Sequence, residues 1–358
     1  MTQPINTLIL GASYGSLLAT KLLMAGHNAH LVCLPAEADL INADGTRVRM
    51  PSKGRDGLIE VDSRKLKGEL TASSPGGVDL KRFDLVALAM QEPQYRSDGV
   101  RQLLDAVARA KLPCMSIMNM PPLPYLARIP GLDTNSLKGC FADAAVWQNC
   151  DPSLMTLCSP DPQAFRPPEE KTNVLQVRLP TNFKVAAFPS AAHTAILKTL
   201  QTDIEAARFD LGSGEKIELP VKLKLHDSVF VPLAKWAMLL AGNYRCVQKG
   251  DMRPIKDAVH SNLAETRAVY EWVVKLCTTL GANAADMVPF EKYANAALSL
   301  GSPSSAARAL AAGAPNIERV DLLVQRIAAQ KGMQSPAVDA TVALVDGWLA
   351  KNRAKAAG

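Results

Sequence analysis

The chain has 358 residues, of which 48% are hydrophobic and 21% are charged, as is usual for a soluble globular protein. Its length exceeds the roughly 250–300 residues at which one hydrophobic core usually divides, so we expect two domains. The net charge of +6 comes from 40 basic residues that are spread along the chain without a polybasic run. This distribution favours a small anionic ligand and argues against nucleic acid as a partner.

The cysteines and histidines form no pattern typical of a metal site or of a disulfide framework. The seven cysteines have no CxxC spacing, and the five histidines include no i,i+4 pair. We therefore expect a reduced, cytoplasmic protein without a bound metal. No apolar run reaches the ~20 residues of a membrane-spanning helix, and the stretch before the first glycine turn leaves no room for a signal peptide.

The first 34 residues have the order of a βαβ unit. An apolar run at residues 7–10 has the length of a strand, and a turn rich in small residues follows at 11–16. Residues 17–25 have a helical pattern that ends at Gly26, a residue common just after helix C-termini. Residues 29–34 predict a second strand. Because a helical crossover joins the two strands, we expect them to be parallel.

The pattern changes several times over the next segments. Apolar runs predict strands at residues 83–90 and 113–118, and helical periodicity predicts a helix at 97–110 between them. Residues 44–82 are polar and contain glycine, which indicates hairpins or loops. The prolines of residues 150–168 indicate irregular structure.

The C-terminal part of the sequence is helical in pattern. A helix is expected at residues 193–210, and Gly212-Ser213-Gly214 marks a candidate linker. We therefore expect an α/β domain over residues 1–215, with a parallel sheet of the Rossmann type, and an all-α domain over 216–358. Apolar residues recur at spacings of three and four in five further segments, which are 229–248, 254–280, 284–298, 316–331 and 336–352. The Ala- and Lys-rich C-terminal tail is expected to fray.

The turn at residues 11–16 is a candidate dinucleotide-binding turn. Such a turn needs small residues for a tight bend, for close approach of the backbone to a pyrophosphate, and for close packing of helix on strand. The helix N-terminus then offers N–H groups and partial positive charge to the phosphates. The GxGxxG fingerprint is only partly met, so a purely structural turn is the alternative. The candidate cofactor-binding residues are Gly11, Ala12, Ser13, Tyr14, Gly15 and Ser16, of which Gly11, Ser13 and Ser16 occupy the fingerprint positions.

The choice of cofactor is usually made at the end of the second strand. An acidic residue there binds the ribose 2′-OH of NAD, and a nearby Arg favours NADP. This chain reads Cys33-Leu34-Pro35 at that position, with Glu37 and Asp39 following. Neither pattern is present in clean form, so the residues leave the choice between the two cofactors open.

A lysine and an asparagine stand eight residues apart in the segment VPLAKWAMLLAGNYR. On a regular helix Lys235 and Asn243 would lie within roughly 80° of each other, so both could face one cleft. The surrounding residues are apolar, which favours a desolvated lysine that acts as a general acid. The alternative is a lysine that extends its ammonium group to water.

The segment SPSSAARALAAGAPNIERVD holds a third set of candidates. Ser304 and Ser305 precede a helical run, where serines either cap the helix or bind a carboxylate. Glu318 and Asp321 open the next helix, where acidic residues are favoured by the helix dipole whatever their function. Each residue is therefore open to a structural interpretation when it is considered alone.

Several of these segments, in this order, resemble the ketopantoate reductases, which are also called 2-dehydropantoate 2-reductases. The resemblance extends over most of the chain, and its partial matches are LILGASYGSLLATKLLMAGHNAHLV, FDLVALAMQEPQ, SIMNM, LAKWAMLLAGN, SPSSAARALAAGAPNIERVD and GMQSPAVD. Some positions depart from the family pattern. Gln91 stands where the family has Lys, Leu239 replaces its first Asn, and Arg308 stands about where it has Asp.

The resemblance implies a Rossmann domain followed by a helical domain of the 6-phosphogluconate-dehydrogenase-like type. It implies that Lys235 is the catalytic lysine and that Asn243 and Glu318 complete the catalytic group. Gln91 and Asn119 would lie near the cofactor, with Asn119 also at the substrate. Ser304, Ser305 and Arg308 would bind the substrate, Arg308 through a two-pronged hydrogen bond to a carboxylate.

The sequence therefore predicts an NADPH-dependent reductase, with NADH as the other possible cofactor. The expected substrate is a small anionic 2-oxo acid or related carbonyl compound other than ketopantoate itself, and the expected assembly is a homodimer. Two alternatives stay open. One is an opine- or imine-forming dehydrogenase, which needs an amine as a second substrate. The other is a catalytically silent NAD(P)-binding sensor.

Overall fold

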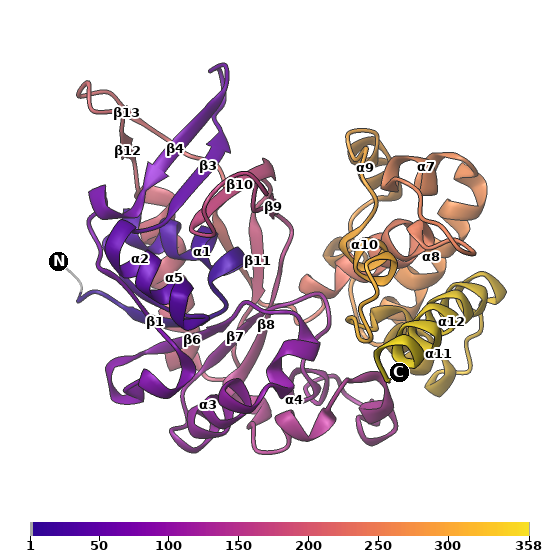
Figure 1. Cartoon of the computed structure of the whole chain (residues 1–358). Coiled ribbons are helices and arrows are strands. Elements are labelled where there is room, and N and C mark those ends of the chain that lie inside the picture. Colours follow the sequence, from indigo (N-terminus) through magenta and orange to yellow (C-terminus); the bar gives the residue numbers. More distant parts are fainter. Residues whose placement is uncertain (1–2, 358) are drawn as a thin grey trace. The chain divides into compact units, whose positions relative to one another are not determined.

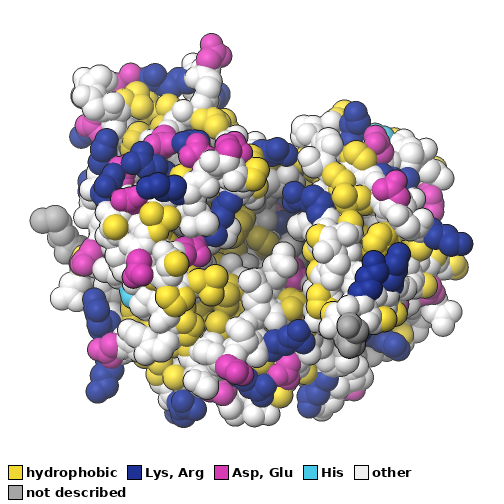
Figure 2. All heavy atoms as spheres, in the orientation of Figure 1, with side chains coloured by type: hydrophobic (Ala, Val, Ile, Leu, Met, Phe, Trp, Pro, Cys, Tyr) yellow, Lys and Arg dark blue, Asp and Glu magenta, His cyan; other side chains and the backbone are white. Residues whose placement is uncertain are grey.

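The computed structural model describes residues 3–357 and divides them into two compact units (Figure 1). The Rossmann unit contains the residues up to Met90 together with Gln94–Met118 and Val146–Asp227. The helical unit contains Gln91–Pro93, Asn119–Ala145 and the described residues from Ser228 onward. Figure 2 shows basic and acidic side chains interspersed over the visible face of each unit.

An eight-stranded sheet forms the centre of the Rossmann unit. Its strand order is β14-β11-β8-β7-β6-β1-β2-β5, and every neighbouring pair is parallel except β11 with β8. The stretch β5-β2-β1-β6-β7-β8 has the order expected of a dinucleotide-binding fold. The strands are β1 (Asn6–Leu10), β2 (Asn28–Val32), β5 (Leu70–Ser73), β6 (Leu85–Leu88), β7 (Cys114–Ile117), β8 (Met155–Ser159), β11 (Phe183–Ala186) and β14 (Leu223–His226).

Helix α1 is the most deeply buried helix of this unit. It spans Ala12–Ala25, and most of its side chains are buried because it packs between the sheet and helix α5. It ends at Gly26, whose φ of 90° is the left-handed conformation expected of a C-terminal cap. The helix begins at Ala12, earlier than the expected residue 17, because the small-residue turn forms its first turn. The other helices are α2 (Pro35–Asp44), α3 (Asp98–Arg109) and α5 (Ala191–Ala206).

A second sheet of four strands is built from two separate parts of the sequence. Its order is β4-β3-β10-β9, with strands β3 (Arg47–Pro51), β4 (Leu58–Asp62), β9 (Gln163–Phe165) and β10 (Val174–Leu179). A short pair, β12 (Phe209–Asp210) and β13 (Lys216–Ile217), forms a third sheet. The prediction that residues 150–168 are irregular was wrong, because β8 and β9 both lie in this range. Pro160 and Pro162 stand between these strands rather than within them.

The helical unit contains helices of different lengths, of which α8 and α12 are the longest, with 17 and 22 residues. The tail that was expected to fray is part of α12, which extends to Ala357. No helix among the described residues is long and apolar enough to cross a membrane. The helices are α4 (Leu123–Leu126), α6 (Lys235–Met238), α7 (Ile255–His260), α8 (Leu263–Thr279), α9 (Phe290–Ala297), α10 (Ser305–Ala311), α11 (Val320–Gln330) and α12 (Pro336–Ala357). This arrangement of an α/β unit and an all-helical unit confirms the predicted fold class.

The boundaries of the two units differ from the single boundary expected between residues 215 and 216. The chain after residue 215 still belongs to the Rossmann unit, because β14 pairs in parallel with β11. Conversely, residues 119–145 belong to the helical unit, where Gln330 of α11 donates to the backbone oxygen of Asp133 at 2.9 Å. Hydrogen bonds between distant segments therefore place both stretches, and the linear pattern of the sequence does not record them.

Lys21 joins α1 to the chain that precedes β14. Its side chain is 2% exposed, and its Nζ donates to the backbone oxygens of Leu219 at 3.3 Å and Pro220 at 2.9 Å. Burial, together with the charge of Lys222, lowers the pKa of Lys21 to about 7, although the carboxylate of Glu218 acts in the opposite direction. The folded state therefore holds a lysine that loses its proton near neutral pH.

This burial makes the stability of the chain depend on pH. An unfolded lysine titrates near 10.4, so between about pH 7 and pH 10 the unfolded chain binds more protons than the folded chain. The contribution of Lys21 to the free energy of unfolding thus rises with pH through that window. We expect Lys21→Met to remove this rise. The free energy of unfolding of the variant, relative to that of wild type, should therefore be higher at pH 6.5 than at pH 9 by on the order of a few kcal/mol.

Urea unfolding at the two pH values measures this difference. The matched control is Lys65→Met, which removes an exposed lysine of the same unit and should leave the pH dependence unchanged. If the free energies of unfolding of Lys21→Met and wild type differ by the same amount at both pH values, the Lys21 ammonium group is not desolvated.

Candidate active site

A hollow of about 390 Å³ in the helical unit collects residues from distant parts of the chain. Its lining consists of Gln91, Asn119, Leu239, Asn243, Tyr244, Ser305, Ala306, Ala309, Ile317 and Glu318. Five of these residues were predicted as site residues from the sequence: Gln91, Asn119, Asn243, Ser305 and Glu318. The chain reaches the first two directly after parallel strands, since Gln91 follows β6 and Asn119 follows β7.

Glu318 is the only acidic or basic residue in the lining, and its carboxylate is held from two sides. The backbone N–H of Glu92 donates to its Oε1 at 3.3 Å, and Nδ2 of Asn119 donates to its Oε2 at 3.4 Å. Glu318 is 8% exposed. Burial raises the pKa of this carboxyl group, while the hydrogen bonds from Glu92, Asn119 and Met120 and the charge of Lys235 lower it in part. Glu318 is thus a buried carboxyl group within the electrostatic reach of Lys235.

Tyr244 fixes the backbone at Glu318. Its hydroxyl group donates to the Glu318 carbonyl oxygen and accepts from the N–H of Val320 at 3.0 Å. Sequence reasoning did not identify Tyr244 or Glu92 as site residues. The signal available for Tyr244 was its position directly after Asn243, but nothing in the sequence indicates that its ring reaches a residue more than seventy positions away.

Asn119 presents an unused acceptor in this hollow. Its Oδ1 is buried and has no hydrogen-bond partner among residues 3–357, whereas its Nδ2 is bonded to Glu318. A buried amide oxygen without a partner is costly, so such an atom is usually paired in the functional state. A ligand with an N–H or O–H group would satisfy it.

The segment that carries Lys235 and Asn243 is not the regular helix that was predicted over residues 229–248. It consists of a 3₁₀ turn (Pro232–Ala234), α6, a π-helical turn (Leu239–Asn243) and another 3₁₀ turn (Tyr244–Cys246). The estimate of roughly 80° between Lys235 and Asn243 therefore does not apply. Asn243 lines the hollow, whereas Lys235 is half-buried beside it and acts on the pKa of Glu318 through its charge. π-Helical turns are frequent at functional sites.

Gly242 lets Tyr293 pack closely against the π-helical turn. A Cβ atom at this position would lie 1.9 Å from Oη and 3.2 Å from Cζ of Tyr293. The Tyr293 hydroxyl group occupies that space because it donates to the backbone oxygen of Met238 at 3.1 Å. Close approach of Tyr293 thus requires glycine at position 242, immediately before Asn243.

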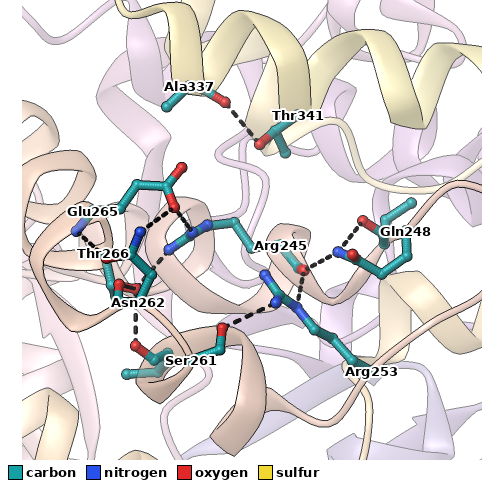
Figure 3. A network of polar contacts seen from close by, with 11 residues as sticks. Arg245, Gln248, Arg253, Ser261, Asn262, Glu265, Thr266, Ala337 and Thr341 are labelled. Carbon is teal, nitrogen blue, oxygen red and sulfur yellow. Dashed lines mark hydrogen bonds and ion pairs between the residues drawn. The ribbon is translucent and has the colours of Figure 1, made fainter.

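Arg245 anchors the end of the same segment (Figure 3). Its guanidinium group donates to Oγ1 of Thr266 at 2.6 Å and to Glu265 at 2.8 Å. Its backbone oxygen accepts from Nε of Arg253 at 3.1 Å and from Nε2 of Gln248 at 3.0 Å. These contacts to α8 and to the following loop hold the backbone just after Asn243 and Tyr244 in place.

The serines that precede α10 have different environments. Ser304 is buried and caps the helix, since its Oγ accepts from the N–H of Ala307 at 3.2 Å and donates to the Asn243 carbonyl oxygen at 2.7 Å. Ser305 is exposed and lines the hollow. Arg308 lies one helical turn later, is exposed, and is not part of the described lining. Asp321 is fully buried in an ion pair with Arg319 at 3.0 Å, which is a structural contact.

The turn after β1 carries the features of a phosphate-binding turn in the Rossmann unit. Gly11 has a φ of 105°, and a Cβ there would lie 2.6 Å from Cγ of Met90 and 2.9 Å from the oxygen of Ala89. A Cβ at Gly15 would lie 2.6 Å from Cγ2 of Ile9, so this glycine allows close packing of helix on strand. No side chain caps the N-terminus of α1, and Ser13 is exposed there. The turn therefore fits a bound phosphate group.

Comparison with solved structures places this architecture among known folds. No family model matches the sequence, and no curated protein sequence matches it. A 2-dehydropantoate 2-reductase from Methylococcus capsulatus is similar with a TM-score of 0.65 and 14% identity, over 97% of this chain and 98% of that one. The chain has the fold of the ketopantoate reductases. The resemblance seen in the sequence is thus confirmed for the fold.

Two further structures share this ketopantoate-reductase fold over nearly their whole length. D-mandelate dehydrogenase, solved with NADH and anilino(oxo)acetate, gives a TM-score of 0.63 at 13% identity, over 98% of this chain and 100% of that one. A dimeric ketopantoate reductase from Staphylococcus aureus gives a TM-score of 0.53 at 10% identity, over 97% and 100%. The fold therefore covers both units of the chain.

The contact between Gly242 and Tyr293 can be tested by mutation. We expect Gly242→Ala to destabilise the protein by about 1–3 kcal/mol, because the new methyl group must displace the tyrosine hydroxyl group. Tyr293→Phe removes that hydroxyl group and should restore part of the loss when it is combined with Gly242→Ala. A double-mutant cycle from urea unfolding measures this coupling. Additive effects of the two substitutions would contradict the contact.

Proposed function

We propose that the protein is an NAD(P)H-dependent reductase that transfers hydride to the carbonyl group of a small 2-oxo acid or a related compound. The observation that carries the proposal is the lining of one hollow by Gln91, Asn119, Asn243, Ser305 and Glu318. The sequence resemblance to ketopantoate reductases selected these same residues, which are far apart in the chain.

The turn that begins α1 binds the pyrophosphate of the cofactor in this proposal. Gly11 to Ser16 lie at the N-terminus of α1, where backbone N–H groups and the helix dipole favour a pyrophosphate. Gln91 and Asn119 follow β6 and β7 and bind near the nicotinamide. When bound, the reduced nicotinamide supplies the hydride. NADPH is the proposed cofactor, and NADH is the other candidate, with which the similar mandelate dehydrogenase was solved.

The helical unit provides the polar groups for the substrate. As the carbonyl carbon is reduced, negative charge develops on its oxygen, and the ammonium group of Lys235 stabilises this charge and donates the proton. Glu318 orients Lys235 or the substrate, and Asn243 and Asn119 hold the substrate by hydrogen bonds. The charge of Lys235 reaches the buried Glu318 carboxyl group, which supports placing both at one reacting centre.

The acidic group of the substrate needs partners as well. The lining of the hollow contains neither lysine nor arginine. We propose that the hydroxyl group of Ser305 and the guanidinium group of Arg308, one turn further along α10, bind a carboxylate. Ser304 contributes by positioning Asn243 through its bond to the Asn243 carbonyl oxygen. We also propose a cytoplasmic homodimer, in line with the dimeric reductase that shares the fold.

The unpaired amide oxygen of Asn119 favours one second candidate. An imine or amine substrate has an N–H group that would satisfy this acceptor, as in an opine- or imine-forming dehydrogenase. Cofactor oxidation with a panel of 2-oxo acids, with and without amines, separates the candidates. Turnover with the acid alone supports carbonyl reduction, turnover only with an amine supports the second candidate, and binding without turnover indicates a sensor.

Cofactor binding at the turn is the first expected outcome. Gly11→Val should weaken binding of NADPH and NADH more than tenfold, because a side chain at φ 105° would both strain the backbone and block its approach to the phosphates. Isothermal calorimetry measures both dissociation constants. Gly76→Val is the matched control, because a Cβ at Gly76 meets nothing within 4 Å. Absence of wild-type binding to either cofactor at millimolar concentration would contradict the proposal.

The role of Lys235 is the second expected outcome. A group that acts only in the transition state affects kcat more than KM, and a positioned acid contributes about 10²–10⁴-fold. Lys235→Ala should therefore lower kcat by about that factor while cofactor affinity stays near that of wild type. Lys235→Arg keeps the charge without a readily transferred proton, so it should restore substrate binding more than turnover.

Steady-state kinetics on the substrate found in the panel measures these effects. The control is Lys256→Ala, which removes an exposed lysine from α7 in the same unit and should leave kcat unchanged. Retention of more than about a tenth of wild-type kcat by Lys235→Ala would show that Lys235 does not donate the proton.

A further inference from the structure

A segment of the Rossmann unit runs from the end of β8 to the end of β9 and connects three parts of the dinucleotide-binding fold. We call residues 159–166 the strap. Its first residues are fixed by Asp161, which accepts from Oγ of Ser159 and forms an ion pair with Lys184 of β11 at 3.1 Å. Its last residues form β9, which lies at the edge of the four-stranded sheet beside β10 (Figure 1).

The middle of the strap is bonded to the phosphate-binding turn. The hydroxyl group of Tyr14, in the first turn of α1, donates to the backbone oxygen of Pro162 at 2.7 Å. The Tyr14 ring also packs edge-on against Phe183 of β11, with centroids 5.8 Å apart. Tyr14 is therefore held by both contacts, and the strap lies against the N-terminal turn of α1.

The end of the strap reaches the residues that follow β2. The Arg166 guanidinium group forms an ion pair with the carboxylate of Glu37 in the first turn of α2, and the two side chains are 28% and 14% exposed. Burial raises the pKa of the Cys33 thiol, directly after β2, to about 12. The negative charge of Glu37 contributes to this rise, and the positive charge of Arg166 partly offsets it. Both charges therefore lie close to the first residue after β2.

This position has a defined role in a Rossmann fold. Groups at the end of the second strand read the adenosine ribose, and they distinguish a 2′-hydroxyl group from a 2′-phosphate. Leu34, which stands at this position in the present chain, is 74% exposed and has no polar side-chain atom. The charged groups are instead supplied by α2 and by the strap, which comes from a different part of the sequence.

We propose that Arg166 binds the 2′-phosphate of NADPH and that Glu37 positions the Arg166 side chain and limits its preference for that phosphate. The proposal rests on the cofactor binding proposed above. A guanidinium group has five N–H donors in a planar fork, so it can donate to Glu37 and to a phosphate at the same time. Glu37 can accept from a ribose 2′-OH, and its negative charge repels a 2′-phosphate. The pair therefore permits both cofactors, with NADPH bound more tightly.

Opposite substitutions in this pair should change the cofactor preference in opposite directions. Arg166→Gln should raise the dissociation constant of NADPH about tenfold or more, because charge-assisted hydrogen bonds to the phosphate are lost. It should change that of NADH less than about threefold. Glu37→Gln should lower the dissociation constant of NADPH and leave that of NADH equal or higher. Arg166→Lys keeps the charge without the fork and should give an intermediate value for NADPH.

Isothermal calorimetry with NADPH and NADH measures these constants without any turnover. The fragments 2′,5′-ADP and 5′-AMP repeat the comparison without the nicotinamide, and Arg166→Gln should weaken the first fragment only. The control is Lys171→Gln, which removes the ion pair of Lys171 with Asp44 at 2.9 Å. This pair joins the chain just after the strap to Asp44 at the other end of α2, about 10 Å along the helix axis from Glu37, so the preference should not change.

The outcomes separate this inference from the proposed function. If wild type binds both cofactors and Arg166→Gln weakens them equally, Arg166 only shapes the strap and the inference is wrong. Unchanged NADPH affinity in Arg166→Gln also overturns it. If wild type binds neither cofactor nor either fragment, the proposed function fails together with the inference. Thermal unfolding of each variant shows whether the fold is intact, and Arg166→Lys keeps the test available if Arg166→Gln does not fold.

Discussion

The burial of the Glu318 carboxyl group is the constraint on which the helical unit depends. A carboxylate is stable away from water only when donors surround it, and this chain supplies them from segments far from Glu318 in sequence. The Glu92 N–H and the Asn119 amide both donate to it, and Tyr244 holds its backbone. These bonds join residues 91–93 and Asn119 to the helical unit, although strands of the Rossmann unit precede both in the sequence.

The irregular helix around Asn243 is held by several tertiary contacts. The apolar periodicity of the segment predicts a regular α-helix. In the structure, Tyr293 lies in the space beside Gly242 and donates to the Met238 oxygen. The backbone adopts a π-helical turn there, and Arg245 and Ser304 fix its C-terminal end. Asn243 consequently reaches the hollow through contacts from α8, α9 and the chain before α10. The local structure at the site thus reflects its neighbours more than its own sequence.

The Rossmann unit shows how an incomplete fingerprint can retain its physical functions. The fingerprint asks for glycine at three places, and this chain has serine at two of them. Gly11 still provides the positive φ and the close approach to Ala89, and Gly15 provides the close packing against Ile9 although it is out of register. The geometry needs space at particular backbone positions, so a glycine displaced by one residue can meet the same requirement.

The sequence by itself determined the fold class, the βαβ start, and the identity of five residues that line the hollow. These follow from local properties, namely apolar periodicity, small residues in a turn and segments that match a family in order. It did not determine that residues 150–168 contain β8 and β9, because strand pairing with β7, β11 and β10 decides that.

It also did not determine the division of the chain into units, the π-helical turn, or the contacts of Tyr244, Glu92 and Arg166. Each of these depends on hydrogen bonds, ion pairs or steric contacts between residues that are distant in sequence. Only the tertiary structure decided them, because partners of this kind leave no periodic trace in a single chain.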